Sequence, residues 1–466
     1  MPQVCETGAT GHQRRATAAF ACLSVVMSVL GGLGHAVAPP GQALSDRSAG
    51  PPATAGALGP PATVPTRCPP TVPQKAWALA LGLNGRVLWE DPLPGPGDSS
   101  QIGPVASHGF GYFADGGAVY ALGQNDGHRA WEFSGGTDVF DQWLWDEDLI
   151  VLEDQVNAHG YTRFDDLDAA TGRLIWSDRL SGHYVFGVPV VSSNGYLSFT
   201  TSKATVQTIN LRTGRTVWSA PAYIQYAGAI ATIGDAVIMA QDGEAVALSA
   251  SDGKRVWAAR LPGNADPAFQ VVDGLVLVTA GIQSYGTSTA LSALDPDDGK
   301  TLWRLNTGTA FDIFSVMAAG PAGLALQGPQ AMDFISRRAG KLAWVDKAMV
   351  GSAAISAASP GVVVHVQGAP GDSDELVAQA AGSGRVLWRD HLPSGSGTAL
   401  VATAGTVVVS TGLSRGDGPV PLAAYRLSDG RRLWGAQAPA FVETTTLLPE
   451  AHLLLVESFN PFEGCI

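Results

Sequence analysis

One segment of the sequence has the spacing of a serine nucleophile. Residues 412–416, Gly-Leu-Ser-Arg-Gly, match the Gly-x-Ser-x-Gly pattern of a nucleophile elbow, whose serine attacks an acyl carbon. Such an elbow follows a strand and must open a helix. Asp417-Gly418-Pro419 comes directly afterwards and forbids a helix. We therefore interpret this segment as a loop rather than as an acyl-transfer site.

A second segment combines three aspartates with a Gly-Lys-Thr sequence at residues 299–301. Gly-Lys-Thr resembles the end of a phosphate-binding loop, but Leu294 stands where that loop needs its first glycine. Asp295, Asp297 and Asp298 resemble the ligands of a calcium loop. Equivalent turns elsewhere in the chain carry one acidic residue or none, so we interpret the three aspartates as turn formers.

Residues 141–148, Asp-Gln-Trp-Leu-Trp-Asp-Glu-Asp, are both acidic and aromatic. Trp143 and Trp145 should lie on one face of a strand, because side chains alternate along it. Two interpretations remain open. Either these residues add packing, or Trp143, Trp145 and Asp146 form an acidic, aromatic rim that binds a ligand or a partner. Acrylamide should quench the two tryptophans first if they form a rim.

The elements that must position these residues are copies of a hairpin ending in Gly-x-x-x-Trp. Residues 167–176, Leu-Asp-Ala-Ala-Thr-Gly-Arg-Leu-Ile-Trp, join two apolar runs through a polar turn, which predicts a β-hairpin. The interval between successive tryptophans runs from 39 residues (257 − 218) to 46 residues (303 − 257). The tryptophans of the nine copies are Trp89, Trp131, Trp176, Trp218, Trp257, Trp303, Trp344, Trp388 and Trp434.

A period of about 40–45 residues made of short strands is the signature of a four-stranded propeller blade. The sequence thus predicts an all-β fold, a β-propeller whose nine tryptophans have a structural role between blades. The residue before each tryptophan is apolar. We expect it to be covered as well, on the opposite face of its strand. We also expect positive φ at the turn glycines, for example Gly172 and Gly299.

The ends of the chain predict how the propeller closes. The first hairpin has no inner strand pair, and the last strand pair has no hairpin, so together they complete one blade. The raw count is then nine blades. Because propellers typically have about 4–8 blades, we expect eight, with one terminal hairpin displaced or degenerate.

Residues 167–176 and 293–303, the latter Ala-Leu-Asp-Pro-Asp-Asp-Gly-Lys-Thr-Leu-Trp, resemble the repeats of PQQ-type propellers. The resemblance extends over about residues 75–458. This group includes the quinoprotein alcohol dehydrogenases and the non-enzymatic BamB-like periplasmic scaffolds. In the dehydrogenases, calcium and a quinone occupy the central funnel below a disulfide between adjacent cysteines. The four cysteines of this chain are not adjacent, so the resemblance favours the non-enzymatic branch.

The N-terminal part of the sequence indicates export. Arg14 and Arg15 precede an uncharged, mostly apolar run at residues 16–33, so we interpret residues 1–43 as an export signal or a signal anchor. A retained run is long enough to serve as a membrane anchor. Residues 44–73 are rich in Pro, Gly and Ala and predict a disordered tether. Residues 74–466 then hold the propeller.

Composition and charge limit the function. The chain has 466 residues, 15% of them charged, and a net charge of −13, which argues against nucleic-acid binding through a general basic field. The nine histidines lack zinc-site spacings. We expect no catalytic residue, cofactor or metal site.

We interpret the chain as a monomeric, non-catalytic binding or scaffold module for an extracytoplasmic protein partner or cell-envelope component. It would be secreted or attached to the outer face of the cytoplasmic membrane. The alternative is a PQQ-dependent or other cofactor-dependent oxidoreductase that uses the central funnel.

The two cysteines outside the leader predict a disulfide. Cys5 and Cys22 lie in the leader, whereas Cys68 precedes the first strand and Cys465 follows the last. A closed propeller must bring those two regions together, and exported thiols tend to pair. We predict a Cys68–Cys465 bridge that clamps the ring where the two chain ends meet. Non-reducing mass spectrometry of the exported protein checks it, and two free thiols would contradict it.

Overall fold

The computed structural model describes nineteen stretches of the chain. They are residues 76–94, 103–135, 139–155, 161–180, 185, 189–222, 230–261, 268–279, 287–312, 316–318, 320, 323–327, 331–347, 356–369, 373–393, 400–403, 405–411, 419–448 and 451–459. The expected export signal and tether, Cys68, Cys465 and residues 412–416 lie outside these stretches. Among the described residues, no helix is long and apolar enough to span a membrane.

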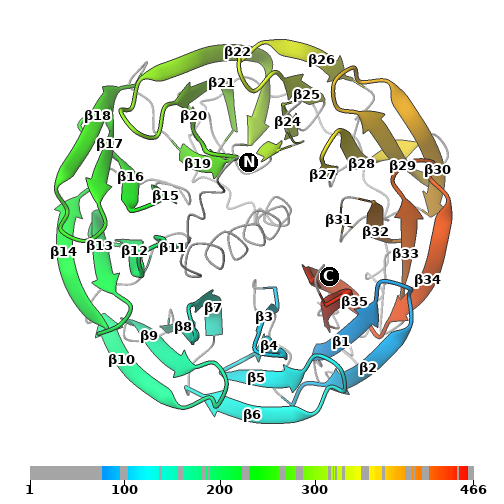
Figure 1. Ribbon diagram of the computed structural model, residues 1–466, viewed down its shortest axis with the longest axis horizontal. Coiled ribbons are helices and arrows are strands. Elements are labelled where there is room, and N and C mark those ends of the chain that lie inside the picture. Colours follow the sequence, from blue (N-terminus) through cyan, green and yellow to red (C-terminus); the bar gives the residue numbers. More distant parts are fainter. Residues whose placement is uncertain are drawn as a thin grey trace, which may run out of the picture.

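Within the described residues, thirty-six strands form nine four-stranded antiparallel sheets, which are arranged as blades around a ring (Figure 1). Each blade is named here by its strands, from the innermost to the outermost. Blades 1 to 3 are β35 (Phe441–Leu448), β36 (Leu453–Phe459), β1 (Ala76–Gly82), β2 (Val87–Pro92); β3 (Val105–Ser107), β4 (Phe110–Asp115), β5 (Ala118–Gly123), β6 (Arg129–Ser134); and β7 (Val139–Trp145), β8 (Asp148–Gln155), β9 (Tyr161–Asp168), β10 (Leu174–Leu180). Blades 4 to 6 are β11 (Val190–Val191), β12 (Tyr196–Thr201), β13 (Thr205–Asn210), β14 (Arg215–Pro221); β15 (Ile230–Ile233), β16 (Ala236–Gln241), β17 (Glu244–Ser249), β18 (Arg255–Arg260); and β19 (Ala268–Val272), β20 (Leu275–Thr279), β21 (Thr287–Leu294), β22 (Thr301–Asp312). Blades 7 to 9 are β23 (Val316–Ala318), β24 (Leu324–Gln327), β25 (Met332–Ile335), β26 (Leu342–Asp346); β27 (Ser356–Ser359), β28 (Val362–Ala369), β29 (Ser373–Ala380), β30 (Val386–Pro393); and β31 (Leu400–Ala402), β32 (Thr406–Ser410), β33 (Val420–Arg426), β34 (Arg432–Ala438).

The predicted β-propeller of four-stranded blades is confirmed, but the choice of eight blades is wrong. Blade 1 combines the N-terminal hairpin with the C-terminal strand pair, and β1 pairs with β36 from Ala76 opposite Phe459 to Gly82 opposite Leu453. Figure 1 shows blue β1 and red β35 in the same blade, joined through β36. Among the described residues, both terminal strand pairs are part of this blade, because β1 pairs with β36 along its full length. The described residues therefore keep the raw count of nine.

The outer-strand tryptophans connect each blade to the next. Each indole Nε1 donates a hydrogen bond, 2.6 to 3.2 Å long, to a backbone carbonyl in the following blade's hairpin turn. The donors and acceptors are Trp89–Gln124, Trp131–Ala169, Trp176–Leu211, Trp218–Ala250, Trp257–Pro296, Trp303–Arg337, Trp344–Ala381, Trp388–Leu427 and Trp434–Leu83. We call this contact the indole latch; the last of the nine joins blade 9 to blade 1.

The glycine of each Gly-x-x-x-Trp repeat is explained by the same latch. Gly172 and Gly299 have φ values of 70° and 72°, as predicted. A Cβ atom on Gly299 would lie 2.5 Å from the ring of Trp257 in the preceding blade. The turn thus needs a residue that tolerates positive φ and that leaves room for an indole. The Gly-x-x-x-Trp repeat therefore reflects a contact between neighbouring blades as well as the turn of a hairpin.

We expect Gly299→Ala to destabilise the protein by more than the strain of a positive φ alone. Backbone strain of this kind costs on the order of 1–3 kcal/mol, and the clash with Trp257 adds to it. Gly243 is the matched control, because its φ is 79° but no atom lies within 4 Å of its added Cβ. Thermal unfolding of both variants tests the contact. Equal shifts in Tm would contradict it.

The residue before each tryptophan differs from the expectation. A β-bulge lies at this position in all nine outer strands: in blade 6, for example, Ala293 opposes Trp303 and Leu294 opposes Thr301, so Leu302 has no partner. The bulge interrupts the strict alternation of side chains. Leu302 is consequently 49% exposed, and the prediction that the neighbouring blade covers this residue is wrong.

The apolar core lies between adjacent blades. Leu277, Leu291 and Trp303 of blade 6 pack with Val316 and Leu324 of blade 7 in one cluster of buried residues. Comparable clusters join other neighbouring pairs of blades. Because each blade buries both faces near the ring's interior but not at its outer edge, the outer strands are where apolar side chains reach solvent.

Candidate functional site

Exposed apolar side chains gather at one end of the outer strands. Every large hydrophobic residue that is exposed among the described residues lies within the first three positions of an outer strand. These residues, here called the outer belt, are Val87, Leu88, Leu174, Ile175, Val217, Val256, Leu302, Leu342 and Leu433. A basic residue stands one or two positions before most of them, such as Lys300 before Leu302. The belt therefore presents apolar and cationic groups together.

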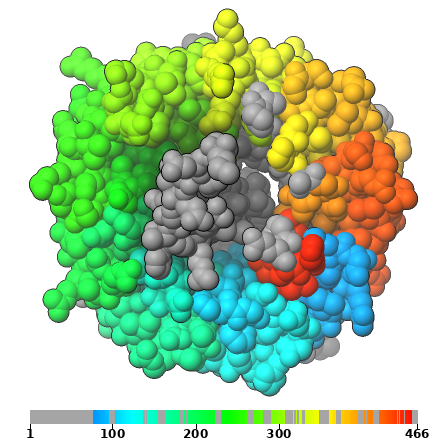
Figure 2. Space-filling view, viewed as in Figure 1, coloured from blue at the N-terminus to red at the C-terminus, as the bar shows by residue number. Residues whose placement is uncertain are grey.

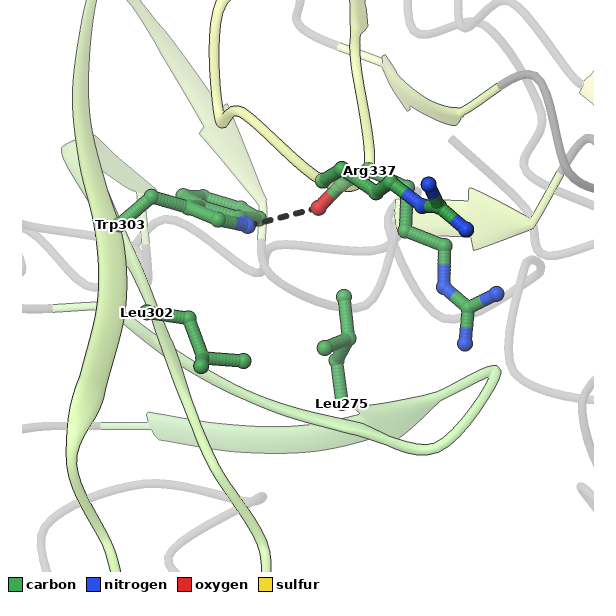
Figure 3. Close-up of a pocket in the computed structure, with 5 residues that line it drawn as sticks. Leu275, Leu302, Trp303 and Arg337 are labelled. Atoms are coloured by element: carbon green, nitrogen blue, oxygen red, sulfur yellow. Dashed lines mark hydrogen bonds between the residues drawn. The ribbon is translucent and has the colours of Figure 1, made fainter.

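The belt deepens into a pocket of about 560 Å³ between blades 6 and 7. It is lined by Leu275, Leu302, Trp303, Arg337 and Arg338 (Figure 3). Leu275 begins β20, Leu302 and Trp303 lie in β22, and the two arginines belong to the turn between β25 and β26. Figure 3 shows Leu302 and the Trp303 indole on one side of the pocket and the Arg337 guanidinium on the other.

The indole latch and an ion pair fix one side of the pocket. Trp303 Nε1 donates to the carbonyl oxygen of Arg337 at 2.7 Å. The Arg337 guanidinium forms an ion pair with Asp273 Oδ2 at 2.9 Å and also donates to the Asp273 carbonyl. Arg338 is exposed, and among the described residues no carboxylate pairs with it. The pocket thus combines an apolar floor with one uncompensated positive charge.

The three residues of the proposed acidic, aromatic rim differ in how far they are exposed to solvent. Trp143 is only 5% exposed and packs in the core beside Ile150 and Phe164. Trp145 is half-buried, with the Arg212 guanidinium 5.1 Å from its ring centroid. Asp146 is exposed at the β7–β8 turn, where its φ is 56°. Packing accounts for Trp143, which is too deeply buried to contact a partner at an open rim.

The aspartates with calcium-loop spacing bind their own turn. Asp295 Oδ1 accepts a hydrogen bond from the backbone N–H of Asp297 at 2.9 Å, and Asp298 Oδ1 accepts one from Lys300 at 2.9 Å. Lys300 Nζ also pairs with Asp298. Within the described stretches, no three His, Cys, Asp or Glu residues are grouped so that they could hold a metal ion.

Two sets of buried polar residues between blades were not predicted. Between blades 2 and 3, Arg163 Nη2 contacts Glu153 Oε2 at 2.6 Å and the Gly135 carbonyl at 2.6 Å, and its Nε lies 2.9 Å from Asp165 Oδ2. Glu153 and Asp165 are 0% and 1% exposed. The guanidinium therefore places its single positive charge between two buried carboxylates and donates a hydrogen bond to the preceding blade.

The second set lies between blades 7 and 8. His365 is fully buried, its Nε2 lies 3.2 Å from Gln367 Oε1 and 3.8 Å from Asp346 Oδ2, and Gln379 Nε2 donates to Asp346 Oδ2 at 2.5 Å. Burial lowers the pKa of His365, although Gln367 and Asp346 oppose that effect. His365 therefore stays neutral at ordinary pH. The sequence signal was a polar residue at an inward position of an otherwise apolar strand.

Blade 3 also holds carboxyl groups with strongly perturbed acidity. The pKa of Asp166 is raised to about 8, mainly by burial and also by the negative charge of Asp148, while the neighbouring Trp176 side chain opposes both effects. Burial raises the pKa of Asp141 to about 8 as well, although the backbone N–H of Gln142 donates to it. Asp166 is buried on β9, whereas Asp141 is half-buried on the innermost strand, β7.

The raised pKa of Asp166 predicts a dependence of stability on pH. Between about pH 4 and 8 the unfolded chain ionises this group while the native state keeps its proton, so the stability should fall as pH rises through this range. Asp166→Asn cannot ionise and should lose less stability from pH 5 to 8. Melting temperatures across this range check the effect. Parallel curves for the two proteins would contradict it.

A family comparison agrees with the repeat and with the fold. The sequence profile of the family described as outer membrane protein assembly factor BamB matches residues 75–225, 115–271, 202–324 and 330–457. Among solved structures, BamB from Moraxella catarrhalis is similar at 21% identity, over 52% of this chain and 70% of that one, with a TM-score of 0.37.

Curated relatives include enzymes. The dehydrogenase subunit of an alcohol dehydrogenase (quinone) from Acetobacter aceti is 27% identical over 31% of this chain and 24% of its own length. A quinohemoprotein alcohol dehydrogenase from Pseudomonas putida is 37% identical over 17% of this chain and 12% of its own. The chain thus spans a quarter or less of the length of these relatives.

Proposed function

This chain belongs to the family described as outer membrane protein assembly factor BamB, and we propose that it is an exported, non-catalytic propeller that binds an extracytoplasmic protein partner. The observation that carries the proposal is the outer belt. Scattered exposed apolar residues need no explanation, but grouped ones mark sites of interaction. Here the exposed large hydrophobic residues of the described chain lie at the start of the outer strand in seven of the nine blades.

The β-bulge in the outer strand is part of every blade, and it accounts for much of this exposure. The indole latch requires Trp and Gly at fixed places, and the bulge before the Trp exposes the bulged apolar residue in every blade except blade 8, where Leu387 is half-buried. A rigid ring can therefore present a row of apolar contacts without any catalytic group. A partner that covers the belt would remove these side chains from water, which stabilises the complex by roughly 25 cal/mol per Å² of apolar surface.

Photo-cross-linking tests the proposed surface. A cross-linking residue is placed at Ile175, Val217 or Leu433 of the full chain, and at Asp242 in the turn at the opposite end of the strands. We expect the three belt positions to capture one and the same envelope protein, and Asp242 to capture none. Replacing the three belt residues together by serine should release that protein. Capture from Asp242 alone would contradict the proposal.

The curated relatives favour a second candidate function, a quinone-dependent oxidoreductase. Absorbance spectra of the purified protein with PQQ and calcium distinguish it from the scaffold. A bound quinone spectrum with alcohol-dependent dye reduction would support the enzyme, whereas an unchanged spectrum together with belt cross-links would support the scaffold.

A further inference from the structure

Building on the proposed partner binding, we propose that the pocket between blades 6 and 7 is a docking point for an acidic, apolar peptide segment of the partner. A carboxylate of the segment would bind Arg338, and an adjacent apolar side chain would lie against Leu302 and Leu275. This assignment names both the place on the belt and the chemistry of the bound segment.

The first argument is that this turn departs from the repeat. The indole latch uses only a backbone carbonyl, so the side chain of the accepting residue and the next one are free to vary. Among the nine described turns, only that of blade 7 carries two arginines there. The nine pairs are Leu83-Asn84, Gln124-Asn125, Ala169-Ala170, Leu211-Arg212, Ala250-Ser251, Pro296-Asp297, Arg337-Arg338, Ala381-Gly382 and Leu427-Ser428.

The second argument is the balance of charge. Asp273 reaches across from blade 6 and neutralises Arg337 at 2.9 Å, whereas among the described residues no carboxylate pairs with Arg338. A guanidinium group binds a carboxylate through two parallel N–H donors. The net charge of −13 opposes a long polyanion. A short acidic segment can bind the positive charge of Arg338 with little repulsion from the net negative charge of the rest of the protein.

The third argument is the apolar floor. Leu275 and Trp303 are 8% and 7% exposed and form the buried apolar part of the pocket lining, whereas Leu302, on the same strand as Trp303, is 49% exposed (Figure 3). The volume of about 560 Å³ lies within the range of roughly 300–1,000 Å³ typical of ligand sites. A bare anion would leave Leu302 uncovered, and an uncharged group would leave Arg338 unpaired. A segment that carries a carboxylate and an apolar side chain can pair with Arg338 and cover Leu302 at the same time.

Fluorescence anisotropy of a short fluorescein-labelled peptide that alternates glutamate and phenylalanine tests the proposal on the full chain. Arg338→Glu and Leu302→Ser should each weaken binding by about tenfold or more. Both side chains are exposed, so neither change should alter Tm. The matched controls are Arg385→Glu, an exposed turn arginine of blade 8, and Val256→Ser, the residue equivalent to Leu302 in blade 5. Both controls should bind like the unmodified protein.

Two further peptides and one membrane complete the test. Replacing glutamate by lysine, or phenylalanine by serine, should abolish binding of the peptide. No binding of the glutamate–phenylalanine peptide, or equal loss in Arg385→Glu, would overturn the pocket assignment. So would binding of phosphatidylglycerol vesicles that displaces the peptide and depends on Arg338. Belt cross-links that persist after such a result would leave the scaffold function standing, so the two proposals fail separately.

Discussion

Replacing Trp303 by alanine should lower the free energy of unfolding by about 3–5 kcal/mol, the usual cost of deleting a large buried aromatic side chain. Trp303 is 7% exposed, belongs to the core cluster between blades 6 and 7, and donates the indole latch to Arg337. The substitution removes all of these contacts. It also empties the space that Gly340 leaves open for the ring. Chemical denaturation of the full chain measures the loss.

The neighbouring residue provides the control for Trp303. Leu302 lies on the same strand but is 49% exposed, so Leu302→Ser should change the free energy of unfolding very little. Trp303→Phe should lie between the two, because it keeps part of the ring volume but loses the indole donor. An alanine variant with unchanged melting and lost partner binding would show that Trp303 acts in recognition instead of architecture.

The repeat allowed the fold to be predicted because its residues report contacts between blades. Gly299 and Trp303 recur at fixed spacing since each glycine accommodates the indole of the blade before it. The strand count per blade followed from the interval between tryptophans. The choice of eight blades failed because it relied on what propellers usually do, whereas the pairing of β1 with β36 leaves no hairpin unused.

The candidate site could not be predicted in the same way. The exposure of Leu302 depends on a bulge, and alternation of apolar residues along a strand does not reveal a bulge. The ion pair that holds Arg337 at the pocket joins it to Asp273, in a turn of a different blade. Such pairs have no fixed spacing in sequence. The composition of residues 141–148 indicated a binding rim, but Trp143 is part of the core.

Arg163→Met should also destabilise the protein by about 3–5 kcal/mol, the cost of removing one partner from a buried ion pair. Methionine keeps much of the side-chain volume but leaves Glu153 and Asp165 buried without their cation. It also removes the hydrogen bond to the Gly135 carbonyl, which ties blade 3 to blade 2. Thermal and chemical denaturation at pH 7 measure the effect.

Replacing the two carboxylates by neutral amides distinguishes an effect of charge from an effect of packing at Arg163. If uncompensated charge causes the loss, adding Glu153→Gln and Asp165→Asn to Arg163→Met should recover a large part of the stability, because the buried carboxylates are then gone. If the loss came from packing or from the Gly135 contact alone, the triple variant would be no more stable than Arg163→Met. A single variant as stable as the unmodified protein would mean that this ion pair contributes nothing net to holding blades 2 and 3 together.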